Sequence, residues 1–315
     1  MYKSTLKRIS TLSKLSFSIL ISALLFACAE GNNQAQEQTE EKSEVEEPKK
    51  EKESKLIEID GQVFSIPSPI QTAFLLKEVG TEYQSNLLNP AKKAAGYTTT
   101  YDKALALGVY GADLGYATIF DQTQDAISYL AVSKKMAGEL GITGVFNEET
   151  VKRFESNLGN QDSLLALVSD GFKSTDRYLK SNQQNDVGVA ILAGGWIETL
   201  HFATALATDY QDEKLKARIG EQKITIKNLV NLLAPYSDGN EKIAGLTNSL
   251  NELKDLYANV DFSYTYVEPT TNEETKTTVI NSKSEVKMSE QQLTDISNKI
   301  NEIRTSIINT DQRRA

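Results

Sequence analysis

Residues 100–119 read TYDKALALGVYGADLGYATI, an apolar stretch of helical length that glycine interrupts at Gly108, Gly111 and Gly115. Glycine costs roughly 1 kcal/mol relative to alanine inside a helix, so this repeated use indicates a close approach by another helix or by a ligand. We favour helix packing, because faces of small residues commonly bring two helices together. The stretch therefore predicts the centre of a helical body.

A second apolar helix with similar glycines is predicted over 185–209. At an offset of 80 residues the two stretches agree in the pairs Gly108 with Gly188, Val109 with Val189, Gly115 with Gly195 and Tyr116 with Trp196. Two explanations stay open, a duplicated helical unit or a coincidence of common residue types. Duplication predicts that residues 68–140 superpose on residues 162–234.

Helices are predicted along most of the remaining chain. Ser68 can cap a first helix that begins at Pro69, where the missing N–H costs nothing. Behind it, apolar residues recur at mostly four-residue spacing, as one buried helical stripe requires, at Ile70, Phe74, Val79, Tyr83 and Leu87. Further helices are predicted at about 121–140, 147–158, 162–181, 213–234 and 240–258, most of them behind an Asp, Asn or Thr.

The final helix, about 290–308, has the clearest pattern. Its apolar residues alternate in spacings of three and four, at Leu293, Ile296, Ile300, Ile303 and Ile307. Ser289 with Gln292 forms a capping-box pattern in front of it. This periodicity predicts one buried face along the whole helix.

Two segments show the alternation of strands. Residues 56–66 alternate about Asp60-Gly61, a pair suited to a tight hairpin turn. Residues 260–288 alternate at Phe262, Tyr264 and Tyr266, and again after a polar stretch. The predicted fold is therefore mainly α, a multi-helix bundle with short N-terminal and late β-hairpins.

The chain begins with the layout of a secretory signal. Positive charges at Lys3, Lys7, Arg8 and Lys14 precede an apolar run over 15–27. As a helix this run would be about 20 Å long, short of the roughly 30 Å hydrocarbon core of a bilayer. We therefore interpret it as a signal peptide rather than a permanent membrane span, and no later segment is expected to reach spanning length.

The run ends in Leu25-Phe26-Ala27-Cys28, which resembles the lipobox of bacterial lipoproteins. The resemblance implies that residues 1–27 are a removed signal peptide and that Cys28 is lipidated, with a diacylglyceryl group and fatty acyl chains such as palmitate. It also implies localisation in the cell envelope, and Ala29 after the cysteine is compatible with the outer membrane. The implied partner of the mature amino terminus is a membrane.

Residues 28–55 are predicted to form the lipidated cysteine and a disordered tether. The segment is rich in Glu and Lys and has Val45 as its only branched aliphatic residue. It cannot bury enough apolar surface to offset its ordering entropy. A coil of this length reaches roughly 30 Å, and a transient solvated helix would also act as a spacer. Residues 56–315 are predicted to form the folded domain.

Charge and cysteine content exclude several classes of function. Loss of the four cations before Cys28 takes the formal net charge from −9 to −13. Such an acidic protein gains nothing from general attraction to phosphate, so no nucleic-acid partner is expected. Cys28 is the only cysteine in the sequence, which rules out an intramolecular disulfide and a cysteine-rich metal site.

Glu198-Thr-Leu-His201 is the sharpest chemical pattern in the sequence. Its spacing places a carboxylate and an imidazole on one helical face, as in helical bundles that bind a di-iron centre. Such bundles need two pairs, and His201 is the only histidine. We therefore expect His201 to cap or pack, with no metal and no cofactor. If the centre of the bundle binds a ligand, the positions involved are Asp113, Tyr116, Trp196, Glu198 and His201.

No nucleophile-elbow, Walker or dinucleotide fingerprint is present. We therefore expect no catalytic residue of those kinds and favour a non-enzymatic lipoprotein that binds or organises another envelope component. Phe262, Tyr264 and Tyr266 could form a recognition edge for it. Two alternatives stay open: a lipoprotein that binds a small ligand or metal at the bundle centre, and an envelope hydrolase that uses a pair of carboxylates.

Overall fold

The computed structural model describes residues 56–59, 62–65, 69–142, 148–157, 160–272, 277–279 and 281–309. The predicted signal peptide, Cys28 and the tether lie outside these residues, as do the Asp60-Gly61 turn and the Ser68 cap. The signal peptide, the lipidation of Cys28 and the tether therefore stay predictions.

The mainly α fold is confirmed. The helices are α1 (Pro69–Glu78), α2 (Thr100–Ile119), α3 (Thr123–Glu139), α4 (Glu148–Ser156), α5 (Gln161–Ser181), α6 (Asn185–Tyr210), α7 (Glu213–Leu233), α8 (Glu241–Tyr257) and α9 (Glu290–Ile308), with short 3-10 turns η1 (Ser85–Leu87), η2 (Ala91–Gly96) and η3 (Ala234–Tyr236).

Side-chain caps fix where several helices begin. Thr99, Asp212 and Asn240 each accept a hydrogen bond from a backbone N–H in the first turn of α2, α7 and α8. At α9 the predicted capping box is present, with the Ser289 hydroxyl accepting from the Gln292 N–H and the Gln292 side chain accepting from the Ser289 N–H. These caps satisfy N–H groups that a helix leaves unpaired at its start.

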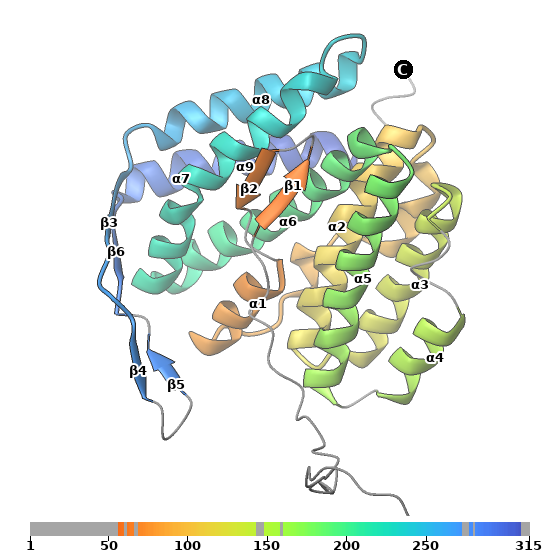
Figure 1. Ribbon diagram of the computed structural model, residues 1–315, viewed down its shortest axis with the longest axis horizontal. Coiled ribbons are helices and arrows are strands. Elements are labelled where there is room, and N and C mark those ends of the chain that lie inside the picture. Colours follow the sequence, from red (N-terminus) through yellow and green to blue (C-terminus); the bar gives the residue numbers. More distant parts are fainter. Residues whose placement is uncertain are drawn as a thin grey trace, which may run out of the picture. The chain divides into compact units, whose positions relative to one another are not determined.

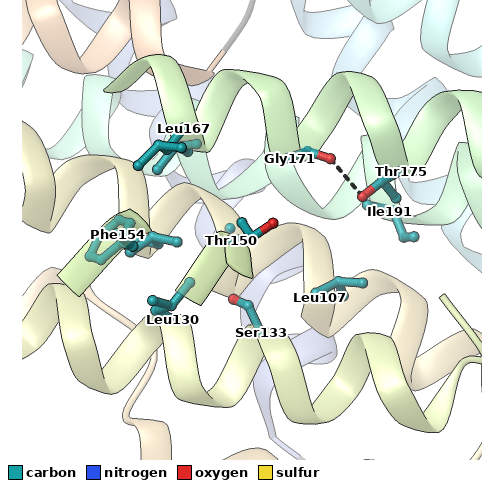
Figure 2. A pocket seen from close by; sticks show the side chains of 12 residues that line it. Leu107, Leu130, Ser133, Thr150, Phe154, Leu167, Gly171, Thr175 and Ile191 are labelled. Carbon is teal, nitrogen blue, oxygen red and sulfur yellow. Dashed lines mark hydrogen bonds between the residues drawn. The ribbon is translucent and has the colours of Figure 1, made fainter. Parts of the chain in front are cut away.

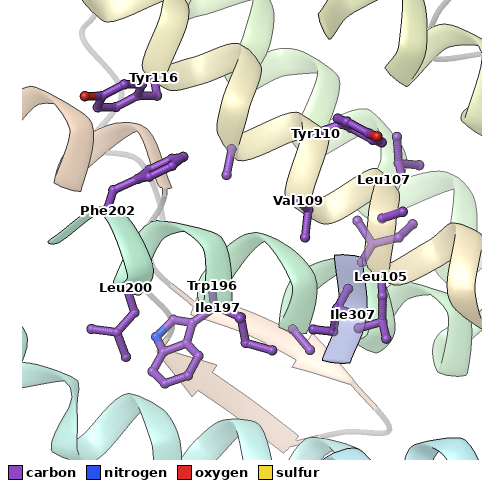
Figure 3. Close-up of a cluster of buried hydrophobic side chains, with 14 of the residues drawn as sticks. Leu105, Leu107, Val109, Tyr110, Tyr116, Trp196, Ile197, Leu200, Phe202 and Ile307 are labelled. Atoms are coloured by element: carbon purple, nitrogen blue, oxygen red, sulfur yellow. The ribbon is translucent and has the colours of Figure 1, made fainter. Parts of the chain in front are cut away.

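Helices α2 and α6 form the centre of the helical body (Figure 1), and their apolar side chains face one another together with Ile307 of α9 (Figure 3). A Cβ atom on Gly108 would lie 1.9 Å from the carbonyl oxygen of Ile191, and one on Gly194 would lie 2.0 Å from that of Leu105. Only hydrogen fits at both positions. The packing interpretation of Gly108 is therefore correct.

The other helices surround this central pair. Helices α1, α3 and α5 pack on α2, and α7 and α9 pack on α6. Helix α8 contacts both α7 and α9, and the short α4 lies against α5. The predicted apolar face of α9 is buried along its whole length.

The strands form antiparallel pairs. In the first hairpin β1 (Leu56–Ile59) pairs with β2 (Gln62–Ser65). In the late one β3 (Asp261–Thr265) pairs with β6 (Lys283–Lys287), and β4 (Thr270–Asn272) pairs with β5 (Thr277–Val279). We call the described residues of 261–287 the ribbon. It extends away from the helices (Figure 1).

The two parts of the ribbon are joined by side-chain hydrogen bonds. The Val267 N–H donates to Ser282 Oγ at 3.1 Å, and Asn281 Nδ2 donates to the Glu268 carbonyl oxygen at 3.0 Å. A Thr271–Thr278 hydroxyl pair at 3.1 Å links β4 to β5. The first two bonds continue the predicted hairpin between the β3–β6 and β4–β5 ladders, and the threonine pair adds to the β4–β5 ladder.

The stripe predicted behind Pro69 is wrong beyond α1, which ends at Glu78. Gly80 has a φ of +81°, and the N–H groups of Gly80 and Thr81 bond back to Lys77 and Leu76 as in a Schellman motif. Within α1 the buried side chains include Ala73 and Leu76, whereas Phe74 is exposed. Leu87 is buried, but it enters the core from η1.

A second correction concerns α6. This helix has 26 residues and is long and apolar enough to cross a membrane by length and composition, contrary to the expectation that no later segment reaches that length. Of its most apolar window 83% is buried inside the protein. The apolar character of α6 is accounted for by its central position between α2, α7 and α9.

Candidate functional site

A cluster of polar side chains lies within the helical body. Helix α6 places Glu198 and His201 one turn apart, α2 contributes Asp113, and α9 contributes Asn301 and Arg304. The side chain of Glu198 and that of Asp113 are completely buried, and His201 and Arg304 are also buried. We call these five residues the polar cluster.

An ion pair between α6 and α9 holds the cluster together. Arg304 donates from Nε to Glu198 Oε2 and from Nη2 to Glu198 Oε1, both at 2.6 Å. Arg304 Nη2 also donates to the carbonyl oxygen of Leu87 at 2.6 Å. A buried pair is tolerated when it is bidentate and additionally hydrogen-bonded, as here. Arg304 thus fastens the last helix to the centre and to η1.

Asp113 lies beside this pair without a cation of its own. Neither of its carboxylate oxygens has a hydrogen-bond partner among the described residues. Burial raises the pKa of Asp113 well above its ordinary value, the Glu198 charge raises it further, and Arg304 acts in the opposite direction. Asp113 therefore holds its proton to higher pH than an exposed aspartate does.

His201 packs within the cluster. Its Nδ1 lies 2.7 Å from Asn301 Oδ1, so the ring N–H is assigned to Nδ1 and donates to that oxygen. Its Nε2 is buried without a partner among the described residues. Burial lowers the pKa of His201, and the Arg304 charge lowers it further, which favours the neutral ring.

The carboxylate of the Glu-x-x-His pattern is paired with a cation from α9. Both carboxylate oxygens of Glu198 are bonded to Arg304. No group of three or more His, Cys, Asp or Glu side chains that could hold a metal ion occurs among the described residues.

The remaining predicted ligand positions lie elsewhere. Tyr116 stacks on Phe202 and Tyr83, with ring centroids 4.6 and 5.5 Å apart. Trp196 donates from Nε1 to Gln222 Oε1 on α7 at 3.0 Å. Figure 3 shows Tyr116 beside Phe202 and Trp196 on another side of α6. The structure thus brings together three of the five predicted positions and adds Arg304, which sequence reasoning missed.

A cavity of about 40 Å³ lies among α2, α3, α4, α5 and α6 (Figure 2). Its walls are mostly aliphatic, and they are formed by Leu107, Gly111, Leu114, Leu130, Ser133, Thr150, Phe154, Leu167, Val168, Gly171, Thr175 and Ile191. The central glycines therefore differ in role, because Gly108 allows helix packing whereas Gly111 borders the cavity.

The ribbon presents aromatic residues to solvent. Strand alternation puts Phe262 and Tyr264 on one face. Val286, opposite Phe262, packs on α7, where a Cβ on Gly220 would lie 2.2 Å from Val286 Cγ1. Farther out, Tyr264 is 56% exposed and Tyr266 is 68% exposed. One end of the ribbon is therefore fixed to the helices while its tyrosines are free for contact.

Comparisons with protein-family models, with curated proteins and with solved structures found no match.

Proposed function

We propose that this chain is a lipid-anchored envelope protein without enzymatic activity, which uses the ribbon to bind another envelope protein. Cys28 is its proposed lipidation site, and the outer membrane is the proposed location. The observation that carries the proposal is the pair of exposed tyrosines on a ribbon whose base packs against α7.

Tyrosine suits such a contact. It supplies a large amphipathic surface while only two side-chain torsions must be ordered on binding. Tyrosine is also enriched among the residues that dominate binding energy at protein interfaces. Because β3 and β6 form a two-stranded sheet, their outer edges also offer backbone groups to a partner strand.

The described interior gives less support to the two alternatives. A hydrolase would need its carboxylates in contact with substrate, whereas Asp113 and Glu198 are completely buried. Of the predicted ligand positions, Glu198 is bonded to Arg304, Trp196 to Gln222, and Tyr116 stacks on neighbouring rings. The tyrosines of the ribbon are exposed and lie outside these internal contacts.

Photo-crosslinking in the cells that produce the protein tests the ribbon. A photoreactive phenylalanine replaces Tyr264 or Tyr266 in the lipidated chain, and a matched control replaces Ile224 of α7, which is 51% exposed. We expect one discrete product of the same mass from both ribbon positions and none of that mass from position 224. The same product from all three positions, or none from the ribbon, would contradict the proposal.

The anchor is tested separately by mass spectrometry of the mature amino terminus. We expect cleavage before Cys28 and a mass increase equal to a diacylglyceryl group with or without a further acyl chain. Two or more chains give lasting attachment, since each buried methylene contributes about 0.8 kcal/mol. Cys28→Ser should prevent the modification, and an unmodified Cys28 in the native chain would refute the assignment.

A further inference from the structure

We propose that the side chain of Asp238 and the backbone nitrogen of Gly239 form a site of spontaneous modification, at which the aspartate converts to isoaspartate. The two residues lie in the turn between η3 and α8. Figure 1 shows this turn at the end of α8 opposite the ribbon. The reaction needs no enzyme and no cofactor, and it is independent of the function proposed above.

The chemistry is that of an Asp-Gly sequence. The Gly239 nitrogen attacks the side-chain carboxyl carbon of Asp238, a C–N bond forms, and the carboxyl hydroxyl leaves with the amide proton as water. Water then adds to either carbonyl of the resulting succinimide. Addition at the backbone carbonyl gives isoaspartate, and addition at the other carbonyl regenerates aspartate. Glycine favours the first step because it has no Cβ to hinder the approach of its nitrogen.

Two of the three Asp-Gly sequences in the chain, at 170–171 and 238–239, lie among the described residues. Asp170 and Asp238 are both exposed, so access to water does not distinguish them. Gly171 lies inside α5, where its N–H belongs to the hydrogen-bond ladder of the helix. The N–H of Gly239 donates to no acceptor among the described residues. The nitrogen needed for the attack is therefore available only in the turn.

The turn also permits the movement that the attack requires. The nitrogen reaches the carboxyl carbon only after rotation about the bond between the α-carbon and the carbonyl carbon of the aspartate. Inside α5 this rotation would break helical hydrogen bonds on both sides of Asp170. Position 238 lies outside a helix, and Gly239 has a φ of +82°, which glycine adopts without strain.

Conversion would disturb the start of α8, because isoaspartate lengthens the main chain by one carbon atom between Ser237 and Asn240. The Asn240 N–H donates to the Ser237 carbonyl oxygen at 3.3 Å. Asn240 Oδ1 caps α8 by accepting from the N–H groups of Lys242 and Ile243, both at 3.2 Å. Lys242 Nζ in turn donates to Asp102 Oδ2 of α2 at 2.7 Å. The modification therefore acts on the cap of α8 and on its link to α2.

The test is prolonged incubation of the full chain at neutral pH, below its melting temperature. Peptide mapping with electron-transfer fragmentation then distinguishes isoaspartate from aspartate. We expect isoaspartate to accumulate at position 238 while position 170 stays aspartate. Asp238→Asn should react faster, because an amide is attacked more readily than an ionised carboxyl group, and Asp238→Ser should not react. Isoaspartate at neither position, or more at 170 than at 238, would overturn the proposal.

Unfolding the chain tests whether the fold makes this selection. In concentrated urea α5 no longer protects Asp170, so positions 170 and 238 should convert at similar rates. A difference that persists in urea would mean that the flanking sequence, rather than the helix, protects Asp170.

The effect on α8 is measured in the folded, incubated protein. Its melting temperature should fall by about 2–4 °C as isoaspartate accumulates, which is the shift expected when a domain of this size loses one helix cap. Asp238→Ser incubated in the same way is the matched control and should keep its melting temperature. An unchanged melting temperature in protein with isoaspartate at position 238 would overturn the role of the turn in holding α8.

Discussion

The polar cluster buries carboxylates and a guanidinium at the centre of the helices, whereas the ribbon leaves two tyrosines more than half exposed. The cluster thus reverses the usual placement of charged residues, whereas tyrosine occurs both buried and exposed. Within the cluster, Glu198 and Arg304 satisfy one another through a bidentate pair. The exposed tyrosines have no comparable role in the fold. We infer that the cluster determines how the helices assemble and that the ribbon is free to serve an external partner.

Breaking the ion pair should have the largest effect. Arg304→Met leaves the Glu198 charge buried without its cation, which typically costs about 3–5 kcal/mol of unfolding free energy. Urea denaturation followed by circular dichroism measures the loss. The double variant Glu198→Leu/Arg304→Met removes both charges and should recover much of it. The single variant Glu198→Leu completes the cycle. If the loss in the double variant equals the sum of the losses in the two single variants, Glu198 and Arg304 are not coupled.

Crowding the α2–α6 contact should come next. Gly108→Ala places a Cβ against backbone atoms of Ile191 and Gly195 on α6, which cannot turn aside as a flexible side chain can. We therefore expect the unfolding free energy to fall by about 2–3 kcal/mol. Gly245→Ala in α8, where an added Cβ meets nothing within 4 Å, serves as the control and should stabilise by up to about 1 kcal/mol. Equal melting temperatures for the two variants would show that the close contact is not required.

The protonation of Asp113 predicts a pH effect of intermediate size. The pKa of Asp113 is higher in the folded protein than in the unfolded chain, where an aspartate has a pKa of about 3.9. The protein therefore loses stability as pH rises above the unfolded pKa and through the folded pKa. Asp113→Asn removes this titration. As pH rises through that window, the unfolding free energy of the variant should increase relative to that of the native chain by up to about 1.4 kcal/mol per pH unit. Urea denaturation at each pH measures the difference. Unfolding free energies of the native chain and Asp113→Asn that run parallel between pH 4 and 8 would contradict the raised pKa of Asp113.

The ribbon should show the smallest effect on stability. Tyr266→Ser changes a side chain that is 68% exposed, so the unfolding free energy should shift by less than about 0.5 kcal/mol. Gly220→Ala at the base should cost more, because its Cβ would meet Val286. A larger effect at Tyr266 than at Gly220 would mean that the tyrosine stabilises the fold rather than serving a partner.

Local chemistry made several elements predictable. The Ser289–Gln292 capping box and the isoleucine spacing gave α9 its observed bounds, because both signals act within a few residues of the helix end. The alternation of Phe262, Tyr264 and Tyr266 likewise predicted the ribbon. The end of α1 was missed because apolar residues continue past Gly80, and a left-handed glycine ends the helix there.

By itself the sequence determined where the helices from α2 onward lie and that Glu198 and His201 share one helical face. Only the tertiary structure decided their surroundings. Arg304 lies 106 positions after Glu198 and reaches it because α9 packs on α6, a contact that no local spacing encodes. The same holds for the glycines of α2: their residue type permits close approach, but what approaches Gly108 and what leaves space at Gly111 depends on how distant helices pack.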